Sequence, residues 1–173
     1  MRLITIYTDG GYDPKTHIGS WAFVAEADES LLSNRSAQQQ ESFSLSGSVL
    51  QTQQLEAPSL QMEVRAVVEA LTWLDCENRH QTILIVSDSK IVVDAINHDL
   101  QFWSENDWQK KKNRTLKCVA MWQALWQLLG QIPNPVKAKW VKGHANHPMN
   151  ERVDSLATQA RQAVCSPGLS SYE

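Results

Sequence analysis

The order of strand-like and helix-like patterns limits this chain to few folds. Three strand patterns come first, at residues 3–8, 19–25 and 43–50. They are followed by a helix pattern over 61–77, a strand pattern over 82–87 and a helix pattern through 91–96. A meander followed by alternating helices and strands predicts an α/β fold with a mixed sheet and a right-handed crossover.

The remaining patterns complete the predicted sheet. A helix is expected from about Thr115 to Leu129, a strand over 137–141 and a last helix over about 150–164. We therefore expect five strands, with an antiparallel meander of strands 1–3, then parallel strands 4 and 5, flanked by helices. Residues 26–41 read as a long polar connection. With 173 residues, 42% of them hydrophobic, one domain over 1–165 is expected, and 166–173 has the composition of a disordered tail.

Hydropathy, cysteine usage and charge narrow the class of protein further. No uninterrupted apolar stretch approaches a membrane span, so we expect a cytoplasmic, monomeric protein without membrane contact. The three cysteines are expected to be reduced thiols. The net charge is −3, yet residues 110–117 hold five cations in eight positions. Such a cluster favours phosphate contacts, because counterion release is local.

Acidic residues stand where these patterns change from one element to the next. Asp9 and Asp88 each follow a strand pattern, Glu63 opens a helix pattern and Asp154 lies in the first turns of another. Ligands of open α/β sheets bind at the carboxyl edge of the strands. Asp88 or Glu63 alone could be a helix cap or a partner of a helix dipole, whereas Asp9 is followed by two glycines and by no helix pattern. Together, four acids in one crevice would repel one another unless hard divalent cations lay among them.

Four segments, at residues 7–11, 62–63, 86–90 and 140–154, closely resemble the bacterial type 1 ribonuclease H family. The resemblance covers nearly the whole chain, and the last segment is highly specific. It implies a ribonuclease H-like fold and an endonuclease that cuts the RNA strand of RNA–DNA hybrids. It also implies two Mg²⁺ ions, with Mn²⁺ as a substitute, and products with 5′-phosphate and 3′-hydroxyl ends.

The resemblance assigns roles to five residues. The metal-binding and catalytic acids of the family fall on Asp9, Glu63, Asp88 and Asp154, and its catalytic histidine falls on His144. Asp9 is the expected bridge between the ions, and Glu63 helps to hold the second ion. His144 is expected to transfer a proton near the leaving group or to aid product release.

Residues 102–117 resemble the basic protrusion, or handle, by which members of the family grip the hybrid. The expected substrate contacts there are Trp103, Trp108, Lys110, Lys111, Lys112, Arg114 and Lys117. The alternative for this segment is an amphipathic, solvated helix.

The chain departs from the family at two loops. Residues 12–19 lack the usual Asn-Pro-Gly core, and residues 58–61 replace a Thr-Asn-Asn stretch. We expect Ser59 and Gln61 to supply some of the lost hydrogen bonds and Lys15 to contact a phosphate. Backbone groups of Gly10 and Gly11 are expected to approach the RNA closely.

Two further functions stay open at this point. One is a non-catalytic module that binds RNA–DNA hybrids, and the other is a different metal-dependent nuclease or strand-transfer enzyme on the same fold. A pure binder would have no need of the complete acid set. The segment at 142–154 and the basic handle favour the ribonuclease.

Overall fold

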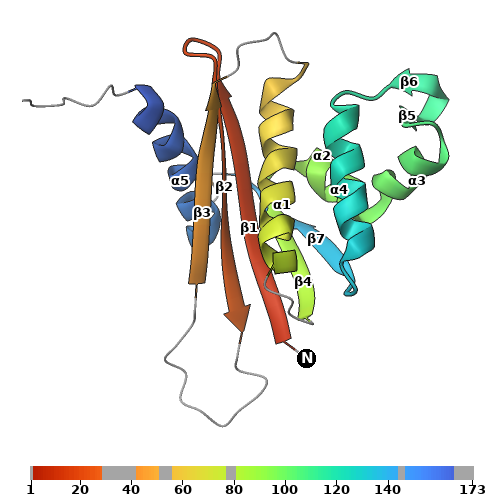
Figure 1. The fold of residues 1–173 in the computed structure, drawn as a ribbon, viewed down its shortest axis with the longest axis horizontal. Helices are drawn as coiled ribbons and strands as arrows, with labels where there is room; N and C mark the ends of the chain where they lie inside the picture. The colour runs from red at the N-terminus through yellow and green to blue at the C-terminus, as the bar shows by residue number, and fades with distance from the viewer. Residues whose placement is uncertain (1, 29–41, 51–55, 77–80, 144–146, 166–173) are drawn as a thin grey trace, which may run out of the picture.

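The computed structural model of the protein describes residues 2–28, 42–50, 56–76, 81–143 and 147–165 (Figure 1). Three expectations therefore lie wholly or largely outside the described residues: the polar connection, the tail at 166–173 and the role of His144. No helix in the described part of the chain is long and apolar enough to cross a membrane.

A five-stranded sheet forms the centre of the molecule. Its strands are β1 (Arg2–Asp13), β2 (Ile18–Asp28), β3 (Ser42–Leu50), β4 (Gln81–Ser87) and β7 (Val136–Trp140), in the order β3-β2-β1-β4-β7. The β1/β2 and β2/β3 pairs are antiparallel, and the β1/β4 and β4/β7 pairs are parallel. The predicted α/β fold with a meander and two parallel strands is therefore confirmed.

Helices cover both faces of this sheet (Figure 1). On one face, α1 (Pro58–Cys76) and α4 (Val119–Gln131) enclose the larger core, into which Ile4 and Ile6 of β1 project. On the other face, α5 (Pro148–Cys165) packs Val153 and Ala157 near Tyr7 of β1. Successive residues of β1 thus point to opposite layers, as the period of a strand requires.

β1 is longer than its apolar run indicates. We predicted an end near Thr8, but the strand continues to Asp13 because it stays paired with β2. Its parallel pairing with β4 stops at Tyr7, opposite Val86. Asp9 therefore lies beyond the parallel ladder but inside the antiparallel one, so one side of β1 is open next to the end of β4.

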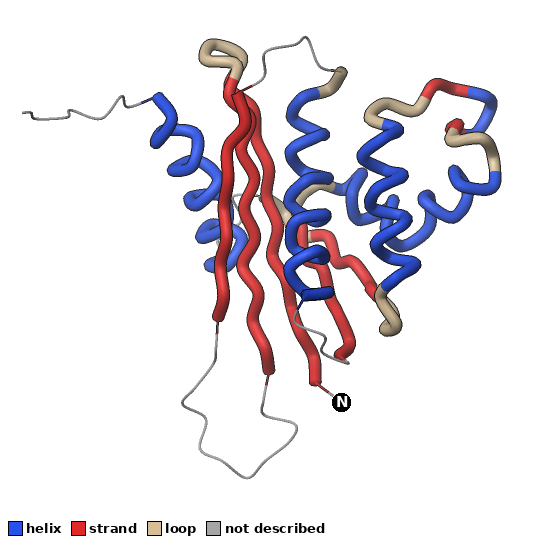
Figure 2. Tube along the Cα trace, viewed as in Figure 1, coloured by secondary structure: helices blue, strands red, loops and turns tan. Residues whose placement is uncertain are grey.

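The handle segment contains short strands. The helical stretch of α2 (Lys90–Asp94), a π-helical turn (Ala95–Asp99) and α3 (Leu100–Glu105) ends before the lysines. Then β5 (Gln109–Lys110) pairs with β6 (Arg114–Thr115) around a 3₁₀ turn (Lys111–Asn113), as Figure 2 shows. The alternative of a solvated helix over this segment is wrong.

The predicted start of the following helix at Thr115 is also wrong. Thr115 belongs to β6, and α4 begins only at Val119. Cys118, directly before the helix, has a left-handed backbone with φ of 60°. Left-handed geometry does not continue a right-handed helix, so the helical pattern cannot extend back through this residue.

Candidate metal centre

Three carboxylates meet at the open edge beside β1. Asp9 comes from β1, Asp88 follows the end of β4, and Glu63 comes from the second turn of α1. One oxygen from each lies within 4.8 Å of the other two. The β1/β4 register explains the first pair, because continuing it two residues past Tyr7 and Val86 sets Asp9 beside Asp88.

Gly10 lets α1 approach the strand closely enough for Glu63 to join them. A Cβ at Gly10 would overlap the backbone of Met62 and Glu63. The Gly10 N–H also donates a hydrogen bond to the carboxylates of both Asp9 and Glu63. The glycine is therefore required by packing inside the protein, and its expected approach to RNA stays a prediction.

Asp154 of α5 completes the set of four acids. Its carboxyl group is hydrogen bonded to that of Asp9. This contact and the negative charge of Asp154 both raise the pKa of Asp9.

The electrostatics show how strongly the cluster resists full ionisation. Burial, followed by the charges of Asp88 and Asp154, raises the pKa of Asp9 from its ordinary 3.8 to about 7. Burial, then the charges of Asp9 and Asp88, raises the pKa of Glu63 well above its ordinary range. Since both shifts oppose negative charge, a positive charge among these oxygens would stabilise the ionised site.

The donor set fits a hard divalent cation. All the candidate ligands are carboxylates, which Mg²⁺ and Mn²⁺ accept readily. Oε2 of Glu63 is buried and has no hydrogen-bond partner among the described residues. A buried oxygen without a partner is rare in native proteins, and an ion is one of its recognised explanations. The residues present therefore fit a metal centre.

Asp88 is positioned by residues that sequence reasoning missed. Nδ2 of Asn150, a residue only 4% exposed, donates to Oδ2 of Asp88 at 3.4 Å. Nε1 of Trp140 donates to the Asp88 carbonyl at 2.9 Å. A Cβ at Gly143 would lie 2.7 Å from the same Oδ2, so only glycine fits there without moving the carboxylate. Asn150, Trp140 and Gly143 all belong to the segment at 140–154. The highly specific family resemblance of that segment was the sequence signal that could have identified them.

Gly143 and His147 flank residues 144–146 in the chain and are the described residues nearest to His144. Gly143, the residue before it, lies against Asp88, whereas 144–146 are outside the described residues. His147 stacks at a tilt against Tyr7, with ring centroids 5.6 Å apart. The catalytic role of His144 stays a prediction.

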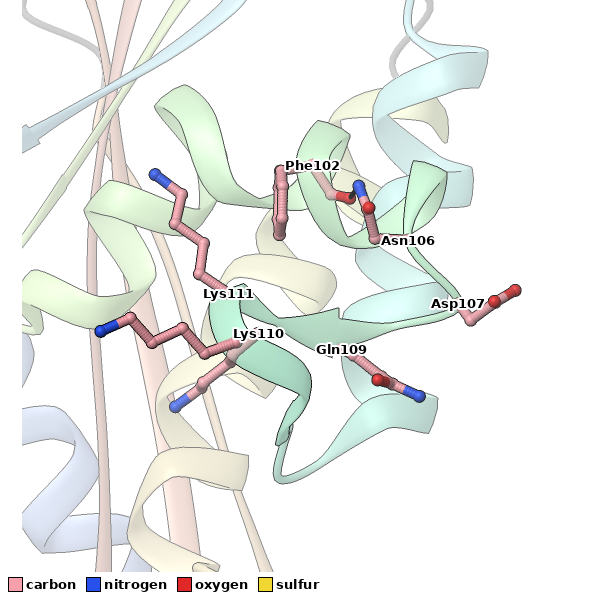
Figure 3. Close-up of a pocket in the computed structure, with 7 residues that line it drawn as sticks. Phe102, Asn106, Asp107, Gln109, Lys110 and Lys111 are labelled. Carbon is pink, nitrogen blue, oxygen red and sulfur yellow. Dashed lines mark hydrogen bonds between the residues drawn. The ribbon is translucent and has the colours of Figure 1, made fainter.

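The handle lysines gather in one place. Lys110, Lys111 and Lys112 line a pocket together with Phe102, Asn106, Asp107 and Gln109 (Figure 3). The side chains of Lys110 and Lys111 project away from Asp107 in this view. Nζ of Lys111 lies 5.8 Å from the centroid of the Phe102 ring. Arg114 is exposed on β6, and Lys117 is exposed just before α4.

The two tryptophans of the handle point inward. Trp103 is 4% exposed and packs against Trp122, with centroids 5.3 Å apart. Trp108 is partly buried against the same core. Both rings therefore anchor the handle to the domain, and the exposed cations are the groups that a substrate can reach.

The other predicted substrate contacts lie in the β1/β2 turn, at the start of α1 and on β1. Lys15 is exposed in the β1/β2 turn, where its backbone N–H donates to Asp13 at 2.9 Å. Ser59 is exposed in the first turn of α1, and the Gln61 side chain donates to the Glu56 carbonyl at 3.1 Å. Gly11 packs against Arg161. Contact with a hybrid stays a prediction for each of them.

Comparisons with known protein sequences all point to one family. A family model described as RNase H matches residues 1–162. The chain is 31% identical over 162 residues to a ribonuclease H of Dichelobacter nodosus, covering 94% of both proteins. It is 34% identical over 162 residues to a ribonuclease H of Pseudoalteromonas atlantica, covering 92% of this chain and 91% of that protein.

Solved structures show the same fold. LC9-RNase H1, described as a type 1 RNase H with the type 2 active-site motif, is 22% identical and superposes with a TM-score of 0.75. That match covers 93% of this chain and 72% of the other. LC11-RNase H1, solved in complex with an RNA/DNA hybrid, is 18% identical with a TM-score of 0.60, covering 94% of this chain and 99% of the other.

Proposed function

The chain belongs to the ribonuclease H family, and we propose on this basis that it is an endonuclease that hydrolyses the RNA strand of RNA–DNA hybrids. The observation that carries the proposal is the acid cluster of Asp9, Glu63 and Asp88, joined by Asp154 through its hydrogen bond to Asp9. The same acids argue against a module that only binds hybrids, since a pure binder has no need of four mutually repelling carboxyl groups, whose repulsion a bound cation relieves.

Asp9, Glu63, Asp88 and Asp154 would hold two divalent ions, for which we propose Mg²⁺ with Mn²⁺ as a substitute. When bound, such ions activate a water on one side of a phosphodiester and stabilise the leaving oxygen on the other. The expected products carry 5′-phosphate and 3′-hydroxyl ends.

The protein's own groups orient this site. The Gly10 N–H fixes the carboxylates of Asp9 and Glu63, while Asn150 and Trp140 hold Asp88 at its side chain and carbonyl. Such fixed orientation matters because a displacement of a ligand by about 1 Å can cost about 10²-fold in rate. We propose His144 as the group that transfers a proton near the leaving oxygen.

A panel of nucleic acids tests the proposal directly. With Mg²⁺, we expect the protein to cut the RNA strand of a hybrid and to leave double-stranded DNA, double-stranded RNA and single-stranded RNA intact. End-labelled RNA and DNA strands in separate reactions identify which strand is cut and which ends form. Cleavage of double-stranded DNA at a rate equal to that of the hybrid would favour the other nuclease activities of this fold.

The handle is expected to set affinity for the hybrid and to leave the chemistry unchanged. Lys110, Lys111, Lys112 and Arg114 lie on β5, β6 and the turn between them, apart from the acid cluster. We therefore expect a variant with Lys110→Ala, Lys111→Ala, Lys112→Asn and Arg114→Ala to raise KM while kcat is nearly retained. Asparagine is chosen at Lys112 because the backbone there is left-handed, with φ of 64°.

Salt dependence distinguishes phosphate contacts from other effects of this variant. The plot of log affinity against log salt has a negative slope, and each lost contact should lower the magnitude of that slope by about 0.9, taking the value for duplex DNA. Gln109→Ala is the matched control, because it alters the same pocket without removing charge. An unchanged slope and KM in the fourfold variant would show that the hybrid is gripped elsewhere.

We also propose that the protein acts as a cytoplasmic monomer. The bacterial ribonucleases H that it resembles support the location, and the single chain supplies both the acids and the handle. Light scattering at the concentrations used for activity measures the assembly directly.

A further inference from the structure

Arg161 is anchored to the sheet beside the acid cluster. It lies on α5 two helical turns after Asp154, on the face that packs against β1 and β2. Its Nη1 donates to Oγ of Ser20 at 2.8 Å, and its Nη2 donates to Oγ1 of Thr158 at 3.2 Å. Ser20 is fully buried, so the guanidinium group is held at a fixed place on the sheet.

The space for this guanidinium group is provided by Gly11. A Cβ at Gly11 would overlap Nη1 of Arg161 and lie 3.2 Å from its Cζ. No glycine in the described part of the chain has a positive φ, so the backbone conformation does not require glycine here. The missing side chain at position 11 is therefore explained by the arginine that occupies its place.

The charge of Arg161 has no acidic partner within the described residues. The two groups that accept its hydrogen bonds, on Ser20 and Thr158, are neutral hydroxyl groups. Asp13, on the same face of β1, instead accepts from Lys15 and Thr16. A guanidinium group has five N–H donors, so three remain for another ligand, and the side chain is partly exposed. Its planar fork suits two parallel hydrogen bonds to a phosphate.

Arg161 lies close to the acid cluster, because it packs against Gly11. Gly11 follows Asp9 by two residues on the same face of β1, a separation of roughly 6.6 Å along the strand. Neighbouring phosphates of a nucleic-acid strand are separated by a comparable distance. We propose that Arg161 binds the phosphate adjacent to the scissile one and so fixes the register of the cut strand over the acids. This inference rests on the proposed function.

A double-mutant cycle tests the inference. Arg161→Gln removes the charge, whereas Gly11→Ala keeps the charge and displaces the guanidinium group. Each is expected to raise KM, and the Kd of uncleaved hybrid in EDTA, by about tenfold to a hundredfold, the range for a hydrogen bond to a charged group. The double variant should be no worse than Arg161→Gln, because both changes remove one interaction. The kcat at saturating hybrid should stay within a few-fold of the parent.

Salt slopes and a charge-matched control separate binding from a structural role. Arg161→Gln should lower the magnitude of the slope of log affinity against log salt by about 0.9. Arg161→Lys should keep the slope and lose part of the affinity, and it serves the test if the glutamine variant does not fold. Arg152→Gln removes the same charge from an exposed position of α5 and should leave Kd unchanged. A lower Tm with parental Kd and slope would mean that Arg161 only ties α5 to the sheet, and would overturn the proposal.

Failure of this inference and failure of the proposed function give different results. If the parent protein cuts hybrids while the Arg161 variants bind them as the parent does, only this inference fails. If the parent does not cut hybrids, the proposed function fails, and the Kd values in EDTA still show whether Arg161 contacts phosphate.

Discussion

Asp9→Asn is expected to abolish cleavage of RNA–DNA hybrids while the fold is retained. Asp9 is the acid that meets all the others, since its oxygen lies within 4.8 Å of those of Glu63 and Asp88 and its carboxyl group is hydrogen bonded to Asp154. An amide of the same shape keeps the packing but removes the negative charge that a bridging ligand supplies. Loss of several kcal/mol of transition-state stabilisation corresponds to a rate lower by about 10³-fold or more.

The same substitution is expected to stabilise the protein when no divalent ion is present. Burial and two neighbouring carboxylates disfavour the charge of Asp9, and the neutral amide removes that repulsion. Thermal unfolding in EDTA should therefore show a higher Tm for Asp9→Asn than for the parent. Adding Mg²⁺ should raise the Tm of the parent more than that of the variant, because a ligand stabilises the state that binds it.

Asp94→Asn is the matched control for both measurements. Asp94 lies on α2 and is paired with Lys90 at 3.1 Å, outside the acid cluster. Its amide variant should cut hybrids at the parental rate and show no gain in Tm. Substantial turnover with Mg²⁺ by folded Asp9→Asn protein would contradict the assignment of Asp9 as a metal ligand.

The sequence predicted the acids of the site because their position follows from strand order. Asp9 and Asp88 each come after an apolar run, and parallel neighbours end at the same edge. The end of β1 could not be predicted in this way. The residues after Asp9 are held in the strand by pairing with β2, a contact that the apolar run of β1 does not encode.

Residues that support the acids were missed for a similar reason. Asn150 and Trp140 act through hydrogen bonds to Asp88, more than fifty positions away in the chain. Gly11 and Arg161 are 150 residues apart, and only the packing of α5 on β1 relates them. The shape of the handle depends on left-handed residues such as Lys112 and Cys118, which are not residue types that favour that geometry.

The stability of the metal-free protein is expected to fall as the pH rises from about 4 to about 7. The folded-state pKa of Asp9, about 7, lies above its ordinary 3.8, and that of Glu63 is also raised. Below pH 4 both groups are protonated in the folded and unfolded chains, so the full stability is present. As the pH rises through this window, the unfolded chain ionises freely while the folded chain retains its protons, and stability is lost.

The loss of folding stability with rising pH is expected to be large enough to measure. A pKa that moves from 3.8 to about 7 corresponds to about 4 kcal/mol in total. For a chain of this length that lowers the Tm by roughly 10 °C. Unfolding in EDTA at several pH values measures it, and the difference between parent and Asp9→Asn isolates the Asp9 contribution from other titrating groups. Curves that run parallel for the two proteins would show that Asp9 titrates normally.

Protonation of Asp9 should also control the rate of hybrid cleavage. A divalent ion competes with protons for Asp9, because a carboxylate must be ionised to act as a ligand. At subsaturating Mg²⁺ we therefore expect the rate of hybrid cleavage to fall by at least about tenfold for each pH unit below the pKa of Asp9, which is about 7. Raising the Mg²⁺ concentration should move this fall to lower pH. A profile that does not respond to Mg²⁺ would instead place the controlling proton on a group that does not bind the ion, and His144 would then be the first residue to replace.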